Sequence, residues 1–304
     1  MERRADVGSA LFHLSVYARA PELFFAARAQ KSGHGGGKSL SPADTGCKKP
    51  LKSGYKQYRK YNAAAPWRGC CPKFMQLKPN EALEELFGDK KIIQNATLYR
   101  FTSDSILLSR FARAKKGDVV ADFCAGCGAV GYHFLCLNPQ IKSLTLFELQ
   151  PALADMAQRT AQLNGFDAEV VVGRLQDTGR EYDGAFSLIL CNPPYERGGF
   201  DNSSYEKAIC RKEITINLEE ILAVAAQKLK FGGRLAIVHR ADRLAELFYT
   251  MKKYNLEPKR MQFVKGSESA AAYLVMAEAV KGGKPSLDVM PELVNTPANG
   301  GGTL

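Results

Sequence analysis

The residues with the clearest chemical meaning are Asn192, Pro193, Pro194 and Tyr195, which directly follow the apolar run Phe186–Cys191. An amine conjugated to an aromatic ring is a poor nucleophile, because its lone pair is delocalised into the ring. The Asn192 side-chain oxygen and the Pro193 carbonyl can both accept hydrogen bonds from such an amine, which favours a pyramidal nitrogen. Two prolines stiffen the loop, and Tyr195 can stack on a flat substrate for about 1–3 kcal/mol per base. We interpret the tetrad as catalytic; the alternative is an ordinary loop with Tyr195 in the core.

A glycine loop provides the second candidate site. Asp122, Gly126, Gly128 and Gly131 follow an apolar run and precede a helical pattern, an arrangement in which the backbone approaches a ligand at a helix N-terminus. Glu148 ends the next apolar run about 20 residues on, where an acid can accept both ribose hydroxyls of a nucleoside. We therefore predict a nucleoside site, against the alternative of a plain tight turn with a solvated acid.

The same stretch imitates a metal site through Cys124, Cys127, His133 and Cys136. Cys124 and Cys127 lie among the loop glycines, and a zinc ion there would occupy the nucleoside pocket. We expect no metal, and we interpret these thiols as small packing residues.

Short apolar strands alternate with helices through most of the chain, which predicts βαβ units and a parallel sheet with ligands at its carboxyl edge. The predicted strands are 118–123, 143–148, 168–172, 186–191, 234–239, 257–264 and 271–279, and the last two form an antiparallel hairpin. The predicted helices are 129–137, 151–164 and 218–229. Residues 81–87 are helical in period, and a further helix begins near 105 with Ser103 or Asp104 as its N-cap.

Composition and charge divide the chain near residue 75. Hydrophobic residues make up 45% of the 304 residues and charged residues 24%, which is typical of a globular protein and excludes a disulfide scaffold or a fibrous chain. Ten of the eleven net positive charges lie in residues 1–74. We expect that segment to be a disordered basic extension, residues 75–294 to be the folded domain, and residues 295–304 to be a flexible tail. A targeting segment and an RNA-gathering arm remain alternatives for the extension.

At these motifs the sequence resembles the class I S-adenosylmethionine-dependent methyltransferases that act on planar nitrogen. Within them it is similar to the bacterial valine-tRNA (adenine-N6)-methyltransferase family, from about Lys91 to about Val294. The blocks that carry this resemblance include YRFTSDSILL (99–108), NPPY (192–195), KAICRKE (207–213), VHRADRL (238–244), LEPKRMQFV (256–264) and KGGKP (281–285). The resemblance implies a Rossmann-like α/β fold with a mostly parallel seven-stranded sheet, and methylation of N6 of adenine 37 in a valine tRNA.

The resemblance also implies which residues contact the methyl donor, S-adenosyl-L-methionine. They are Phe101, Asp104, Asp122, Cys124, Gly126, Gly128, Glu148, Leu149, Gln176, Asp177 and Asn192. The sequence departs from the family pattern at two positions near the donor, Arg174 and Cys124. Arg174 stands where an acid is expected near the donor adenine, so Gln176 or Asp177 takes that role, and Cys124 stands where the loop usually has glycine.

The partner implied by the resemblance is tRNA, held through its phosphates. The candidate cations are Arg197, Arg211, Arg240, Arg243, Lys281 and Lys284, with Lys207, Lys212, His239, Lys259 and Arg260 as further members of the same blocks. Two other functions stay open: a protein glutamine-N5 methyltransferase, which faces the same lone-pair problem, and a non-catalytic RNA-binding protein. We expect a cytoplasmic monomer with no membrane segment.

Overall fold

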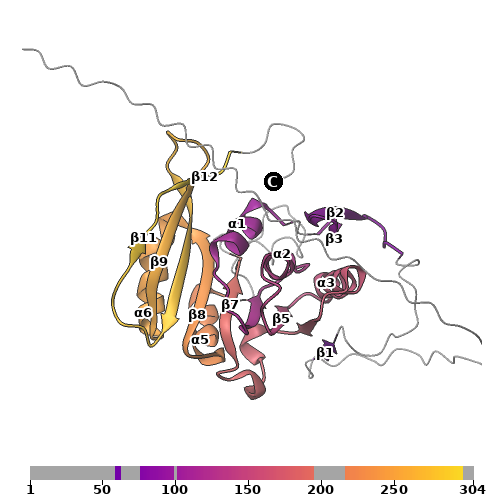
Figure 1. Ribbon diagram of the computed structural model, residues 1–304, viewed down its shortest axis with the longest axis horizontal. Helices are drawn as coiled ribbons and strands as arrows, with labels where there is room; N and C mark the ends of the chain where they lie inside the picture. The colour runs from indigo at the N-terminus through magenta and orange to yellow at the C-terminus, as the bar shows by residue number, and fades with distance from the viewer. Residues whose placement is uncertain (1–58, 63–75, 99–100, 195–215, 297–304) are drawn as a thin grey trace, which may run out of the picture. The chain divides into compact units, whose positions relative to one another are not determined.

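The computed structural model describes residues 59–62, 76–98, 101–194 and 216–296. Their centre is a ten-stranded sheet in the order β1-β6-β5-β4-β7-β8-β10-β9-β11, with β12 also paired to β9 (Figure 1). The parallel strands are β4 (Val119–Phe123), β5 (Ser143–Glu148), β6 (Ala168–Val172), β7 (Phe186–Cys191) and β8 (Leu229–Arg240). The strand order reverses direction beside β4, which is where ligands bind in doubly wound sheets.

Helices cover both faces of this sheet and enclose two hydrophobic cores. One core contains side chains of α1 (Ser103–Phe111), α2 (Ala129–Leu137) and α3 (Pro151–Asn164). The other contains side chains of α5 (Leu218–Lys228) and α6 (Leu244–Lys253). Strands buried on both faces are apolar at nearly every position, and β7 is buried along its whole length. The α/β architecture with a mostly parallel sheet expected from the sequence is confirmed, with α2 and α3 at their predicted boundaries.

The sheet ends in an antiparallel hairpin, as predicted. β9 (Leu256–Lys265) pairs with β10 (Ala272–Lys281), and β10 lies antiparallel to β8. Two short strands, β11 (Asp288–Val289) and β12 (Leu293–Val294), then run parallel to β9 and extend this edge. Asn295, placed by the sequence at the start of a loose tail, donates from its side chain to Ser103 Oγ at 3.0 Å. Residues 297–304 of that tail lie outside the described residues.

The N-terminal part of the chain contains one strand that the sequence did not predict. Residues 1–74 were expected to be disordered, but β1 (Arg59–Asn62) pairs antiparallel with β6. The other residues of this segment lie outside the described residues. Together with β11 and β12, β1 raises the strand number from the expected seven to ten.

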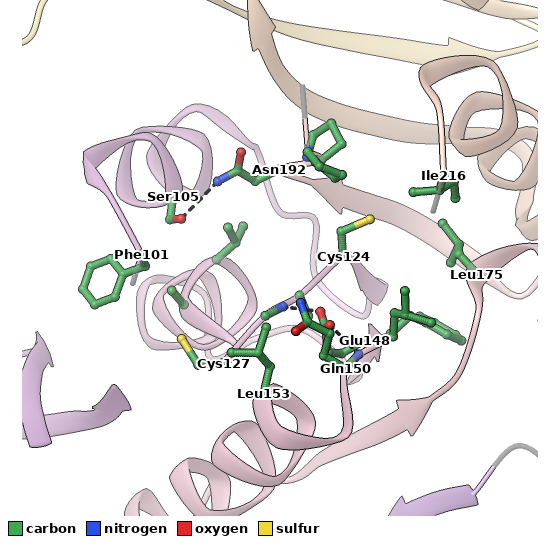
Figure 2. A pocket seen from close by; sticks show the side chains of 18 of the residues that line it. Phe101, Ser105, Cys124, Cys127, Glu148, Gln150, Leu153, Leu175, Asn192 and Ile216 are labelled. Carbon is green, nitrogen blue, oxygen red and sulfur yellow. Dashed lines mark hydrogen bonds between the residues drawn. The ribbon is translucent and has the colours of Figure 1, made fainter. Parts of the chain in front are cut away.

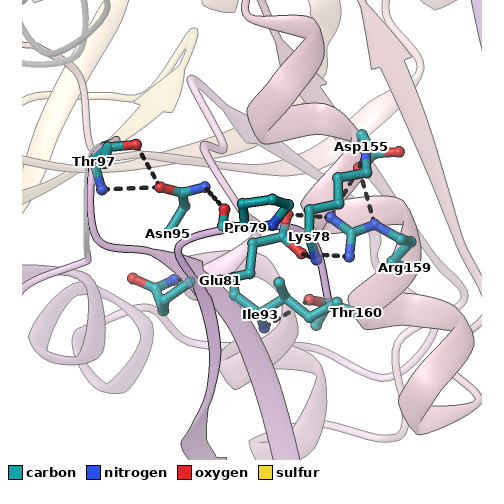
Figure 3. A network of polar contacts seen from close by, with 10 residues as sticks. Lys78, Pro79, Glu81, Ile93, Asn95, Thr97, Asp155, Arg159 and Thr160 are labelled. Carbon is teal, nitrogen blue, oxygen red and sulfur yellow. Dashed lines mark hydrogen bonds and ion pairs between the residues drawn. The ribbon is translucent and has the colours of Figure 1, made fainter. Parts of the chain in front are cut away.

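The helix expected at residues 81–87 is a strand, β2 (Glu81–Phe87), which forms a hairpin with β3 (Lys90–Asn95). Its composition favours a helix, but Gly88 at φ +56° turns the chain back and tertiary contacts then outweigh propensity. Arg159 of α3 holds Glu81 through two contacts of 2.5 and 2.8 Å, and Lys78 bonds Asp155 at 2.6 Å (Figure 3). The hairpin is thereby fixed against α3.

The helix α1 also begins slightly earlier than expected. Thr102 occupies the N-cap position in extended backbone geometry, without a side-chain capping bond. Ser103 and Asp104, the predicted caps, lie in the first turn instead.

Candidate functional site

A cavity of about 330 Å³ lies at the carboxyl ends of the parallel strands (Figure 2). This volume is in the range of small-ligand sites. The cavity brings together the glycine loop after β4, the acid at the end of β5, the segment after β6, the end of β7 and the first turn of α1. Its lining includes Phe101, Thr102, Asp104, Ser105, Cys124, Gly126, Cys127, Glu148, Leu149, Gln150, Leu153, Arg174, Leu175, Gln176, Asn192, Pro193, Pro194 and Ile216.

The glycine loop is a left-handed turn between β4 and α2. Gly126 has φ +60° and Gly128 has φ +91°, and a Cβ on Gly128 would lie 2.3 Å from the Tyr132 ring. Gly128 therefore permits close packing of loop against helix, and it is not among the cavity-lining residues. Cys124 adopts φ +57° at the position where the family usually has glycine, so this chain accepts a conformation that L residues rarely adopt.

Glu148 holds the loop and borders the cavity at the same time. Its two carboxylate oxygens accept hydrogen bonds from the Gly126 amide at 2.8 Å and from the Gln150 amide at 2.7 Å. The side chain is almost fully buried, and burial raises the pKa of the carboxyl against the lowering effect of these amides. A carboxylate has about four acceptor sites, so Glu148 keeps capacity for ligand hydroxyls.

Asp122 was predicted to contact the ligand, and in the structure it supports the glycine loop. It is fully buried and absent from the cavity lining, and its Oδ2 accepts from the Gly131 amide at 2.8 Å. Its Oδ1 has no hydrogen-bond partner within the described part of the chain. Burial, with the nearby Glu148 charge, raises the pKa of Asp122 to about 8. In this structure Asp122 supports the loop from behind, and its contact with the methyl donor stays a prediction.

Gln94 of β3 connects the N-terminal hairpin to both sides of the cavity, a connection that the sequence did not reveal. The buried amide donates from Nε2 to Cys127 Sγ at 2.7 Å, and its Oε1 accepts from the Phe101 amide at 3.0 Å. One side chain therefore joins the glycine loop to the segment that leads into α1.

Asn192 lies at the carboxyl end of β7 and lines the cavity with Pro193 and Pro194. Its Nδ2 donates to Ser105 Oγ of α1 at 3.1 Å (Figure 2). The Asn192 nitrogen makes this bond, and the Asn192 carbonyl oxygen does not bond Ser105. Tyr195, the fourth member of the motif, lies outside the described residues.

After β6, the structure places Gln176 and Asp177 differently, the two residues that the sequence left as alternatives for contact with the donor adenine. Gln176 lines the cavity, as does Arg174, whereas Asp177 does not. The short helix Leu175–Asp177 leaves Asp177 exposed. Of the two alternatives, Gln176 is the residue placed to contact a ligand here.

Several candidate RNA-binding cations are engaged within the protein. Arg243 is 8% exposed and bonds Glu246 at 2.8 Å, and Lys281 donates to the Leu229 carbonyl at 2.8 Å. Arg260 is buried over the Phe111 ring. The sequence indicated charge but not these partners, which give the three residues structural contacts; their RNA contacts stay predictions. Exposed Lys284 and Arg240, the latter paired with Asp242, stay candidates; Arg197, Lys207, Arg211 and Lys212 lie outside the described residues.

The apparent metal-binding pattern is divided among unrelated contacts. Cys127 accepts from Gln94, and His133 Nδ1 lies 2.7 Å from Ser109 Oγ. Burial lowers the pKa of His133 to about 4. Among the described residues, no group of three His, Cys, Asp or Glu side chains could hold a metal ion. The helices of the described ranges are also too short or too polar to cross a membrane.

The cavity fits a nucleoside with a cationic substituent. Glu148 offers a buried carboxylate for hydroxyl groups, Asp104 adds a second acid to the lining, and Leu153, Leu175 and Ile216 provide apolar surface for a flat ring. The sequence analysis did not predict Leu153 and Ile216 as cavity residues, because apolar residues at such positions are also typical of the hydrophobic core.

Comparisons with known proteins agree with this geometry. A family model described as methyltransferase small domain matches residues 100–254. A tRNA1(Val) (adenine(37)-N6)-methyltransferase of Porphyromonas gingivalis is 26% identical over 192 residues, covering 60% of this chain and 75% of the relative. Ribosomal RNA small subunit methyltransferase C of Proteus mirabilis is 30% identical over 136 residues, covering 45% of this chain and 35% of the relative. A solved structure titled a predicted O-methyltransferase, from Agrobacterium tumefaciens, aligns with a TM-score of 0.52 at 19% identity, covering 66% of this chain and 91% of that chain.

Proposed function

This chain belongs to the methyltransferase small domain family, and we propose that it methylates the exocyclic N6 amine of an adenine in tRNA, at the anticodon-loop position 37 of a valine tRNA. The observation that carries the proposal is the presence of Asn192 and Pro193 in the same cavity as Glu148 and the glycine loop. One cavity thus contains the groups suited to a nucleoside methyl donor and the groups suited to a planar amine.

The cofactor of this family and fold is S-adenosyl-L-methionine, which supplies an electrophilic methyl group on a positively charged sulfur. Glu148 would accept hydrogen bonds from its ribose, and the backbone of Gly126 would lie beside it. The lining contains two acids, Asp104 and Glu148, against one basic residue, Arg174, and this balance favours a cationic ligand. Gln176 would contact the adenine edge, and so take the role of the acid that the family pattern has at the position of Arg174.

Asn192 and Pro193 perform the step that the substrate requires. Their carbonyl oxygens accept hydrogen bonds from the amine, so its lone pair is no longer spread into the ring and points at the methyl group. The prolines hold these acceptors in place before the substrate arrives, and such positioning can supply about 7–11 kcal/mol of the barrier. The adenine must leave the stack of the RNA loop to reach them, and Tyr195 would stack on it there.

RNA as the substrate is supported by the names of two relatives, a tRNA methyltransferase and a ribosomal RNA methyltransferase. The tRNA relative aligns over more of this chain, which is why we choose tRNA. A cytoplasmic location and a monomeric state are part of this proposal. Exposed cations such as Lys284 would contact phosphates, so binding should weaken as salt rises.

The experiment that tests this proposal measures transfer of labelled methyl groups from S-adenosylmethionine to bulk tRNA and, in parallel, to total protein. We expect label in tRNA and a steep fall of RNA binding between low and moderate salt. Label in protein with none in tRNA would contradict the proposal and favour a glutamine methyltransferase. Donor binding without any transfer would favour a non-catalytic RNA-binding protein.

A further inference from the structure

The first turn of α1 forms part of the cavity wall and touches the catalytic loop. Ser105 lines the cavity, is 3% exposed, and its Oγ accepts from Asn192 Nδ2 at 3.1 Å, although the two residues are 87 positions apart. Figure 2 shows the two side chains pointing toward one another across the end of β7. A buried contact between distant segments at the reacting group suggests a role in positioning.

The two ends of an asparagine amide are nearly the same shape and have opposite hydrogen-bonding character, and in this structure the nitrogen is the end that bonds the Ser105 hydroxyl. The oxygen accepts, whereas the NH₂ group donates. The terminal torsion of asparagine is broad and roughly two-fold, so the side chain alone does not select one orientation. An Asn192 turned the other way would present a donor to the substrate amine, and that amine already carries hydrogens.

We infer that Ser105 is a positioning residue that holds the Asn192 amide with its nitrogen toward α1, so that its oxygen is presented to the substrate amine. The inference rests on the proposed function of Asn192 as a hydrogen-bond acceptor. It adds a residue of the TSDSILL segment to the machinery of amine methylation, and it assigns that segment a task on the substrate side as well as the donor side.

The rest of α1 is fixed independently of Ser105. Gln94 Oε1 holds the Phe101 amide just before the helix, and the Asn295 side chain donates to Ser103 Oγ. Leu108 and Phe111 bury the helix in the core. Removal of the Ser105 hydroxyl should therefore change the orientation of Asn192 while the helix stays in place.

Ser109 provides a matched control, one turn further along the same helix. It is 1% exposed, and its hydroxyl bonds the Ile106 carbonyl and His133 Nδ1, both away from the cavity. Ser109→Ala therefore removes an equally buried hydroxyl from the same helix without touching Asn192.

The test compares kcat on bulk tRNA with the calorimetric Kd for S-adenosylmethionine in purified full-length variants. Ser105→Ala should lower kcat about 3- to 10-fold, the size of one ordinary hydrogen bond, while the donor Kd changes less than about twofold. Ser105→Thr, which keeps the hydroxyl, should recover most of the turnover. Ser109→Ala should keep the kcat of the unaltered protein.

A double-mutant cycle separates positioning from general structure. In an Asn192→Ala background, Ser105→Ala should have no further effect on kcat, because the amide that it orients is gone. The inference is overturned if Ser105→Ala has normal kcat, if it lowers donor affinity in parallel, or if it lowers kcat equally with and without Asn192. If the unaltered protein methylates no tRNA, both the proposed function and this inference are wrong. If it methylates tRNA normally and Ser105→Ala has the same kcat, only this inference is wrong.

Discussion

The two walls of the cavity are built differently. On the wall that would hold the methyl donor, the buried acidic side chains of Asp122 and Glu148 accept hydrogen bonds from main-chain amides of α2, of the glycine loop and of the chain after β5. On the acceptor wall, Asn192 is oriented by one side-chain bond to Ser105 of a distant helix. The donor wall is therefore held mainly by backbone amides, with one side-chain link from Gln94, whereas on the acceptor wall the described residues give the Asn192 side chain one hydrogen bond, to Ser105. This difference predicts that substitutions in the two walls affect different kinetic constants.

The largest effect is expected on the acceptor wall. Asn192→Ala removes an acceptor that is used on the amine during the reaction, and kcat should fall about 10²- to 10³-fold, as for other preorganised hydrogen-bonding groups. The calorimetric Kd for S-adenosylmethionine should stay within about threefold, because one hydrogen bond at most is lost from the donor site. A parallel loss of donor affinity would show that the two walls are not separable.

On the donor wall, Glu148→Gln should weaken binding rather than chemistry. Hydrogen bonds to a charged group contribute about 1.5–3 kcal/mol, so the donor Kd should rise roughly 10- to 100-fold. At saturating donor, kcat should recover to near normal. Glu169→Gln, a control in β6 outside the cavity lining, should leave donor affinity unaltered. Equal effects of the two substitutions would refute the role of Glu148.

A smaller effect on the donor wall is expected from Gln94→Leu. This change removes the bonds to Cys127 and to the Phe101 amide, and the donor Kd should rise about 3- to 10-fold if each bond has ordinary strength. Asn164→Ala is the matched control, because it breaks the bond between α3 and Lys91 of the same hairpin away from the cavity. Should both variants bind the donor normally, the hairpin would have no influence on the loop.

The last prediction concerns a different property, the pH dependence of stability. Burial raises the pKa of Asp122 from 3.8 to about 8, so between these values the folded protein holds a proton that the unfolded chain has lost. The stabilising contribution is complete below about pH 4 and declines as pH rises to about 8. Asp122→Asn, which retains an acceptor for the Gly131 amide, should remove this decline. Urea unfolding from pH 5 to pH 8 should show the unaltered protein losing stability relative to the variant; parallel curves would contradict the assignment.

The sequence signals for the donor wall are local, and the structure brings Gly126 and Glu148 to one cavity. The glycine loop and Glu148 occupy neighbouring βα units, and three helices and most parallel strands were placed within a residue or two. The sequence did not reveal which residues of the loop face the cavity. Asp122 and Gly128 support it from outside the cavity, since whether a residue faces the ligand or the helix depends on the turn geometry.

The acceptor wall and the N-terminal hairpin show why the rest could not be predicted. Ser105 and Gln94 act through partners far away in the chain, and neither residue type nor spacing indicates such a contact. Residues 81–87 have a helical composition, yet their pairing with β3 and contact with Arg159 select a strand. Arg243 and Arg260 had the right charge for RNA, but they are paired or stacked inside the fold.

The most direct test of the central claim is the identity of the methylated nucleoside. Bulk tRNA is labelled with S-adenosylmethionine, digested to nucleosides and separated. Two acceptors at Asn192 and Pro193 suit an exocyclic amine, and the tRNA relative makes adenine the expected base, so we predict N6-methyladenosine as the labelled product. A methyl group on a ribose hydroxyl, or on a ring atom without N–H bonds, would contradict the account, and N2-methylguanosine or N4-methylcytidine would contradict the choice of adenine.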